Sequence, residues 1–73
     1  MDHKDNKLIK GLIKALTDKP DFDEAGELAD KLEQHHANDI TNVWISMLID
    51  DLSSQNQAKA QQDLKTIKTK LTK

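Results

Sequence analysis

The chain has 73 residues, which is enough for one domain, and 13 acidic side chains against 11 basic ones give a net charge of -2. The absence of cysteine excludes disulfides, thiolate zinc sites and cysteine nucleophiles. The basic residues are all lysines. Since nucleic-acid readers rely on arginine for bidentate contacts, and the net charge is negative, nucleic acid is not an expected partner.

The first helical segment is predicted over residues 7–18. Its apolar side chains recur at steps of one, three and four residues, which places them on one helix face. The segment should end before Pro20, because proline disfavours helix in the residue that precedes it. Residues 1–6 are expected to be frayed, and they lack the apolar stretch of a secretory signal. The apolar face consists of Leu8, Ile9, Leu12, Ile13 and Leu16.

The second helix, predicted over residues 21–36, has the clearest start signal in the chain. Asp21 can cap the free N–H groups of this helix, and Glu24 lies three residues later, which is the spacing of a capping box. Gly26 lies off the apolar stripe and costs about 1 kcal/mol relative to alanine. The stripe consists of Phe22, Ala25, Leu28, Ala29 and Leu32.

The third helix, predicted over residues 39–53 with Asn38 or Asp39 as its cap, is the most apolar. Its apolar side chains cover an arc of about 240° on a helical wheel. Because three neighbouring helices do not need so wide an arc, some of Trp44, Ile45 and Ile49 should be exposed. That face would then bind a partner or form a weak homodimer. A lone tryptophan such as Trp44 is otherwise a core residue.

The fourth helix, predicted over residues 56–71, has only a narrow apolar seam and should be the most loosely held. The seam consists of Ala60, Leu64, Ile67 and Leu71. Residues 53–73 carry a net charge of +4, and residues 17–52 carry -8. This segregation has two interpretations: the basic helix packs beside the acidic middle, or its lysines face a partner or an anionic membrane surface.

Four periodic segments with short connections predict an all-α, antiparallel four-helix bundle that occupies residues 1–73 as a single domain. The longest nearly apolar run covers residues 43–49, which is far short of the roughly 20 residues needed to span a bilayer. We therefore expect no membrane insertion and a cytoplasmic location.

The sequence predicts no catalytic, cofactor-binding or metal-binding residue, and hence no enzyme. His35 and His36 are adjacent, so on a helix they should point about 100° apart and not serve one ion. Asp50 and Asp51 should diverge in the same way, with no pocket to raise a pKa. A glycine-rich phosphate loop is also missing from the sequence.

The order of the apolar segments resembles that of the small cytoplasmic immunity proteins of lactic-acid bacteria, of the enterocin A and mundticin type. The stretches that carry the resemblance are LIKGLIKAL, ELADKLEQ, VWISMLIDDLSS and QQDLKTIKTKL. The family protects a producer from its own pediocin-like bacteriocin, and the resemblance implies an antiparallel four-helix bundle.

The resemblance also implies binding without catalysis, to a complex of the bacteriocin with a sugar-transport permease. The expected contact region is then the fourth helix, through Lys59, Lys65, Lys68, Lys70 and Lys73. An alternative hypothesis is a small helical adaptor or regulator of phage or plasmid type. It would bind a protein through the apolar face of the third helix, with Trp44, Ile45 and Ile49 as contacts.

Overall fold

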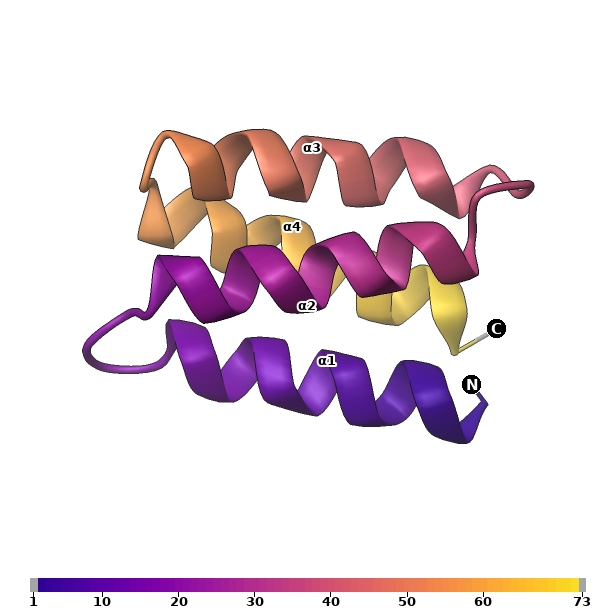
Figure 1. Cartoon of the computed structure of the whole chain (residues 1–73), viewed down its shortest axis with the longest axis horizontal. Coiled ribbons are helices and arrows are strands. Elements are labelled where there is room, and N and C mark those ends of the chain that lie inside the picture. Colours follow the sequence, from indigo (N-terminus) through magenta and orange to yellow (C-terminus); the bar gives the residue numbers. More distant parts are fainter. Residues whose placement is uncertain (1, 73) are drawn as a thin grey trace.

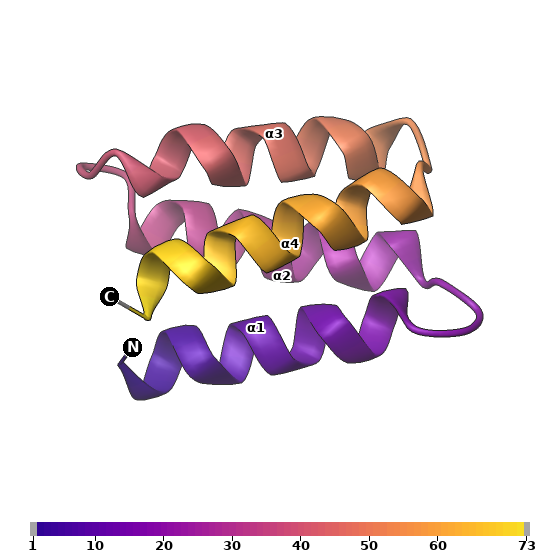
Figure 2. The same cartoon turned by 180° about the vertical axis from the view of Figure 1, so that it is seen from behind.

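The computed structural model describes residues 2–72, and these residues form four helices. They are α1 (His3–Leu16), α2 (Phe22–His35), α3 (Thr41–Ser53) and α4 (Gln57–Leu71). Each helix runs antiparallel to the one before it (Figure 1). Both α1 and α3 pack against α2 and α4, so the helices occupy the four corners of a bundle, as Figure 2 shows from behind. The predicted antiparallel four-helix bundle is confirmed.

The first helix begins four residues earlier than predicted, so the expectation that residues 1–6 are frayed is wrong from His3 onward. Its start is stabilised by Asp2, whose Oδ1 accepts a hydrogen bond of 2.8 Å from the backbone N–H of Asp5. Residue 1 lies outside the described part. The helix ends at Leu16, and Asp18 in the following turn adopts a left-handed φ of 57°.

The second helix begins as predicted, because Asp21 accepts a hydrogen bond of 3.1 Å from the N–H of Glu24. The return bond of a capping box is absent from the described residues, since the N–H of Asp21 donates instead to the carbonyl of Ala15 at 2.8 Å. This bond fastens the turn to the end of α1. The third helix begins at Thr41, later than expected, and Asp39 accepts from the N–H of Thr41 at 2.8 Å.

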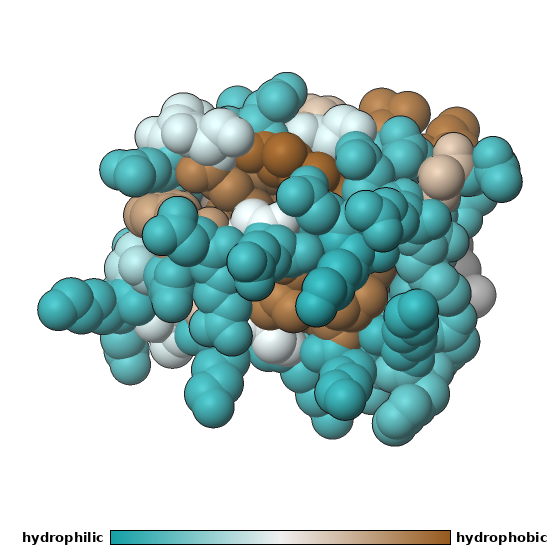
Figure 3. All heavy atoms as spheres, viewed as in Figure 1, coloured by the Kyte–Doolittle hydropathy of each residue, from teal (hydrophilic) through white to brown (hydrophobic). Residues whose placement is uncertain are grey.

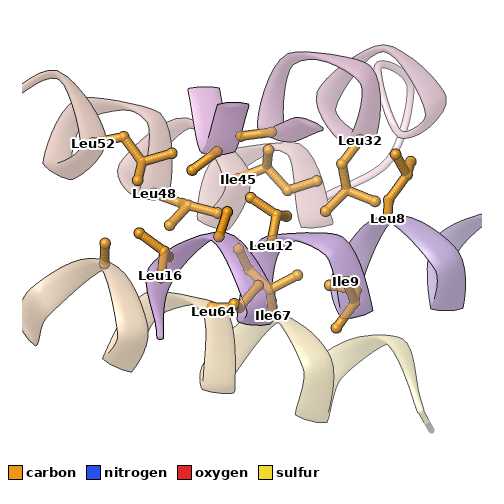
Figure 4. Packing of buried hydrophobic residues seen from close by; sticks show 14 residues of the cluster. Leu8, Ile9, Leu12, Leu16, Leu32, Ile45, Leu48, Leu52, Leu64 and Ile67 are labelled. Carbon is orange, nitrogen blue, oxygen red and sulfur yellow. The ribbon is translucent and has the colours of Figure 1, made fainter. Parts of the chain in front are cut away.

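The core lies on the bundle axis and receives side chains from all four helices (Figure 4). The seam predicted for α4 is confirmed for Ala60, Leu64 and Ile67, and Leu71 is half-buried. Each large apolar side chain buried here contributes about 1.5–3 kcal/mol. The buried residues are Leu8, Ile9, Leu12, Ala15, Leu16, Ala25, Ala29, Leu32, Ile45, Leu48, Leu52, Ala60, Leu64 and Ile67.

Within residues 2–72, none of the helices combines the length and the apolar character that crossing a bilayer requires.

Candidate functional site

The α3 residues predicted to contact a partner are placed differently from one another. Ile45 is fully buried and points into the core, so its predicted role as a partner contact is wrong (Figure 4). Trp44 and Ile49 are half-buried and pack against the core. The exposed apolar side chains at the start of α3 are others, namely its N-cap Ile40 at 80%, Val43 at 57% and Met47 at 44% exposure.

These three side chains, which we call the α3 stripe (Ile40, Val43 and Met47), lie on one face of the helix end. Their spacing of three and four residues places them next to one another along the helix. Hydrophobic atoms gather over the start of α3, at the upper right of Figure 3. Exposed apolar patches of this kind mark interaction sites on soluble proteins.

The lysines predicted as contacts on α4 are exposed where they are described, namely Lys59, Lys65, Lys68 and Lys70. Lys73 lies outside the described residues. The Nζ atom of Lys70 lies 4.7 Å from the centroid of the Trp44 ring, a cation–π contact between α4 and α3. Within residues 2–72, the salt bridges involve histidines and not these lysines.

A second cluster lies at the end of the bundle where α1 begins and α2 ends. His35 is the last residue of α2, and His36 follows with φ -117° and ψ 24°, outside the helix. The predicted divergence of the two histidines assumed one continuous helix and is therefore wrong. Their ring centroids are 5.1 Å apart in an edge-to-face arrangement. Both rings face Asp5 of α1, which is buried with only 4% exposure.

Short contacts connect the Asp5 carboxylate to both imidazoles. Each Asp5 oxygen lies 3.0 Å from Nε2 of His36, and Oδ1 lies 3.6 Å from Nε2 of His35. Asp2 Oδ2 lies 3.1 Å from the same His35 nitrogen. On its other side, His36 contacts Asp39 through Nδ1 and Oδ2 at 2.6 Å. Five side chains from α1, α2 and the α2–α3 connection thus form one network.

The network shifts the pKa values of His36, Asp39 and Asp2. Burial lowers the pKa of His36, but hydrogen bonds to Asp39 and Asp5 outweigh it and raise the pKa above its usual value. The hydrogen bond from His36 lowers the pKa of Asp39. The backbone N–H of Asp5, and then His35, lowers the pKa of Asp2. The fold therefore favours negative carboxylates around His36.

A pair of carboxyl groups also lies between α3 and α4. Asp51 was expected to have no pocket that raises a pKa, but it faces Asp63 of α4. Burial, a shared hydrogen bond with Asp51 and the charge of Asp51 raise the pKa of Asp63 to about 6, and Lys59 opposes the shift. The Oδ2 atom of Asp63 is buried and has no hydrogen-bond partner among the described residues. A proton shared between Asp63 and Asp51 reduces the repulsion between the two carboxylates.

Comparison of the chain with protein-family models, with curated proteins and with solved structures finds no match. The resemblance to immunity proteins consequently rests on the apolar spacings and on the order of the helices.

Proposed function

We propose that this protein acts by binding a partner protein through the face that α3 and α4 share. The observation that carries the proposal is the α3 stripe, three large apolar side chains exposed at helical spacing. Trp44 and Lys70 border the stripe on the α4 side. Tryptophan is the residue type most enriched among energetic hot spots of interfaces, and burial of each apolar side chain contributes about 1.5–3 kcal/mol.

The more specific proposal is a cytoplasmic immunity protein that binds a complex of a pediocin-like bacteriocin with a sugar-transport permease. It is supported by the antiparallel order of the four helices and by the exposed lysines of α4. Lys65, Lys68 and Lys70 would contact the target. Because exposed charges contribute little to stability, replacing these lysines should leave the fold intact. The protein would act by binding to this complex and would catalyse no reaction.

The alternative proposal is a helical adaptor or regulator, and the α3 stripe favours it. In that case, the stripe supplies the affinity, and the lysines set the orientation and the rate of association. A weak homodimer through the same stripe would show as a concentration-dependent mass in sedimentation. A monomer at all concentrations would leave the stripe free for another protein.

The two proposals are separated by expressing the chain in strains sensitive to individual bacteriocins. Under the immunity proposal, resistance to one pediocin-like bacteriocin rises and resistance to unrelated ones does not. The variant K65Q/K68Q/K70Q should lose the protection. K7Q/K10Q/K14Q removes the same number of exposed charges from α1 and should keep it. An absence of protection across a broad panel would rule out the immunity proposal.

The stripe is tested by a matched pair of exposed apolar residues. Met47 and Ile13 are 44% and 41% exposed, on α3 and α1. Met47→Asp should abolish protection or capture of the partner, and Ile13→Asp should preserve them. Ile45→Asp is unsuitable, because it would place a charge in the core. Equal effects of the two exposed substitutions would refute a contact surface on α3.

A further inference from the structure

We propose that Asp5, His35 and His36 bind a divalent transition-metal ion of the zinc type, with Asp2 as the fourth ligand. Nothing in this inference depends on the partner-binding face, which involves α3 and α4. The cluster joins the start of α1 to the end of α2.

The donor atoms already lie close to the separations that such an ion needs. Zinc is bound by imidazole nitrogen and carboxylate oxygen at about 2.0–2.2 Å, so neighbouring ligand atoms of a tetrahedral site are about 3.3 Å apart. Asp5 lies 3.0 Å from Nε2 of His36 and 3.6 Å from Nε2 of His35, and Asp2 lies 3.1 Å from the latter. One donor atom each of Asp5, His35 and His36 lies within 4.8 Å of the others. Asp2 lies outside this group of three, so its carboxylate has to turn inward from His35 to complete the site.

Asp39 prepares His36 for this role. Its Oδ2 lies 2.6 Å from Nδ1 of His36, and a carboxylate there holds the proton on Nδ1. In the structure without metal, Nε2 donates to the Asp5 carboxylate, so an entering cation displaces the Nε2 proton while Asp39 retains the proton on Nδ1. Histidines that bind zinc commonly donate their second ring N–H to such a carboxylate, which fixes the tautomer and raises the basicity of the ligand.

Burial and charge also favour a cation at this position. Asp5 is 4% exposed, and within residues 2–72 its carboxylate oxygens contact histidines and no lysine. A buried carboxylate requires a compensating positive charge. Asp2 and Asp5 together offer two negative charges, which match one divalent ion bound by two neutral imidazoles. Since Asp2 and His35 are exposed, water and an entering ion reach the site from the surface.

An ion bound here would fasten α1 to α2 more strongly than the apolar packing and the Asp–His hydrogen bonds do. Any ligand that binds only the folded state stabilises it by mass action. At a zinc concentration about ten times the dissociation constant, a domain of this size should gain about 6–10 °C in Tm.

The test uses the full chain without a histidine tag, freed of metal by a chelator and titrated with Zn²⁺. Melting is followed by circular dichroism, and Co²⁺ is used in parallel for its absorption in a tetrahedral N/O site. We expect a saturable rise in Tm and a cobalt spectrum at one equivalent. Both should disappear in His35→Gln and His36→Gln, and both should persist in His3→Gln, which removes an exposed histidine of the same helix end outside the cluster.

Folding of each variant is established from its spectrum before metal is added. Because Asp5 and His36 are largely buried, their variants could lose stability for other reasons, so the exposed His35→Gln is the decisive one. The proposal is overturned if Zn²⁺ does not change the Tm of the parent chain. It is also overturned if His35→Gln keeps the full zinc response, or if His3→Gln removes it.

Discussion

Replacing Asp63 by asparagine tests whether the carboxyl pair between α3 and α4 destabilises the bundle near neutral pH. Asparagine has the shape of the protonated acid, and its amide can donate to the Asp51 carboxylate at every pH. Burial and Asp51 raise the pKa of Asp63 to about 6, against an ordinary value of 3.8. The folded state therefore holds this proton more tightly than the unfolded chain does.

The direction of the pH effect follows from that difference. The stability from the protonated pair is fully present below about pH 4 and is lost as the pH rises through about 6. A shift of this size corresponds to a ceiling of about 3 kcal/mol, at 1.36 kcal/mol for each pKa unit. Because solvent reaches part of Asp63 and screens the pair, we expect the pair to lower the free energy of unfolding at pH 7 by about 1–2 kcal/mol. Asp63→Asn should thus stabilise the protein by that amount at pH 7 and by almost nothing at pH 4.

Urea unfolding of both proteins at several pH values between 4 and 7 measures this difference directly. Comparison at each pH cancels the titration of groups that both chains share. Asp50→Asn is the control, since it removes a like charge from the exposed neighbour of Asp51. It should change stability by less than about 0.5 kcal/mol. If Asp63→Asn raises the free energy of unfolding equally at pH 4 and pH 7, repulsion between the two carboxylates is not the cause.

Two further substitutions test local features of α1 and α2. An added Cβ at Gly26 meets no atom within 4 Å, so Gly26→Ala should stabilise by about 0.5–1 kcal/mol in urea unfolding. At Gly11 the added Cβ would lie 3.0 Å from Leu28 Cδ1, so Gly11→Ala should stabilise the protein less than Gly26→Ala does. Equal stabilisation by the two substitutions would contradict this. Asp21→Ala should cost about 1 kcal/mol through loss of the cap, and Asp21→Asn much less; similar costs would show that the charge, and not the acceptor, matters.

The number and order of the helices and the start of α2 could be predicted because each depends on local signals. Apolar residues at helical spacing mark each helix, and Asp21 and Pro20 mark the boundary between the first two. The apolar pattern does not mark the start of α1, which instead depends on the Asp2 cap and on Asp5 three residues later, the spacing of a capping box. Where the signal is local, the sequence is sufficient.

The exposed face of α3 could not be predicted, because the helix has more apolar side chains than its neighbours cover. A helical wheel shows how wide the apolar arc of α3 is, but it does not show which part of that arc faces the bundle axis. Ile45 and Leu48 are fully buried, whereas Ile40 and Val43 face outward. That choice depends on the positions of α2 and α4, which are long-range information.

The Asp–His cluster results from two ordinary capping preferences that the antiparallel fold brings together. Acidic residues are favoured at helix starts and histidines at helix ends, because each complements the helix dipole. Asp2 caps α1, Asp5 lies in its first turn, and His35 ends α2. In an antiparallel pair the start of one helix lies beside the end of the next, so carboxylates and imidazoles chosen for separate reasons meet. Because α2 ends between its two histidines, both rings can turn toward Asp5, and the capping groups form the cluster that we propose as a metal site.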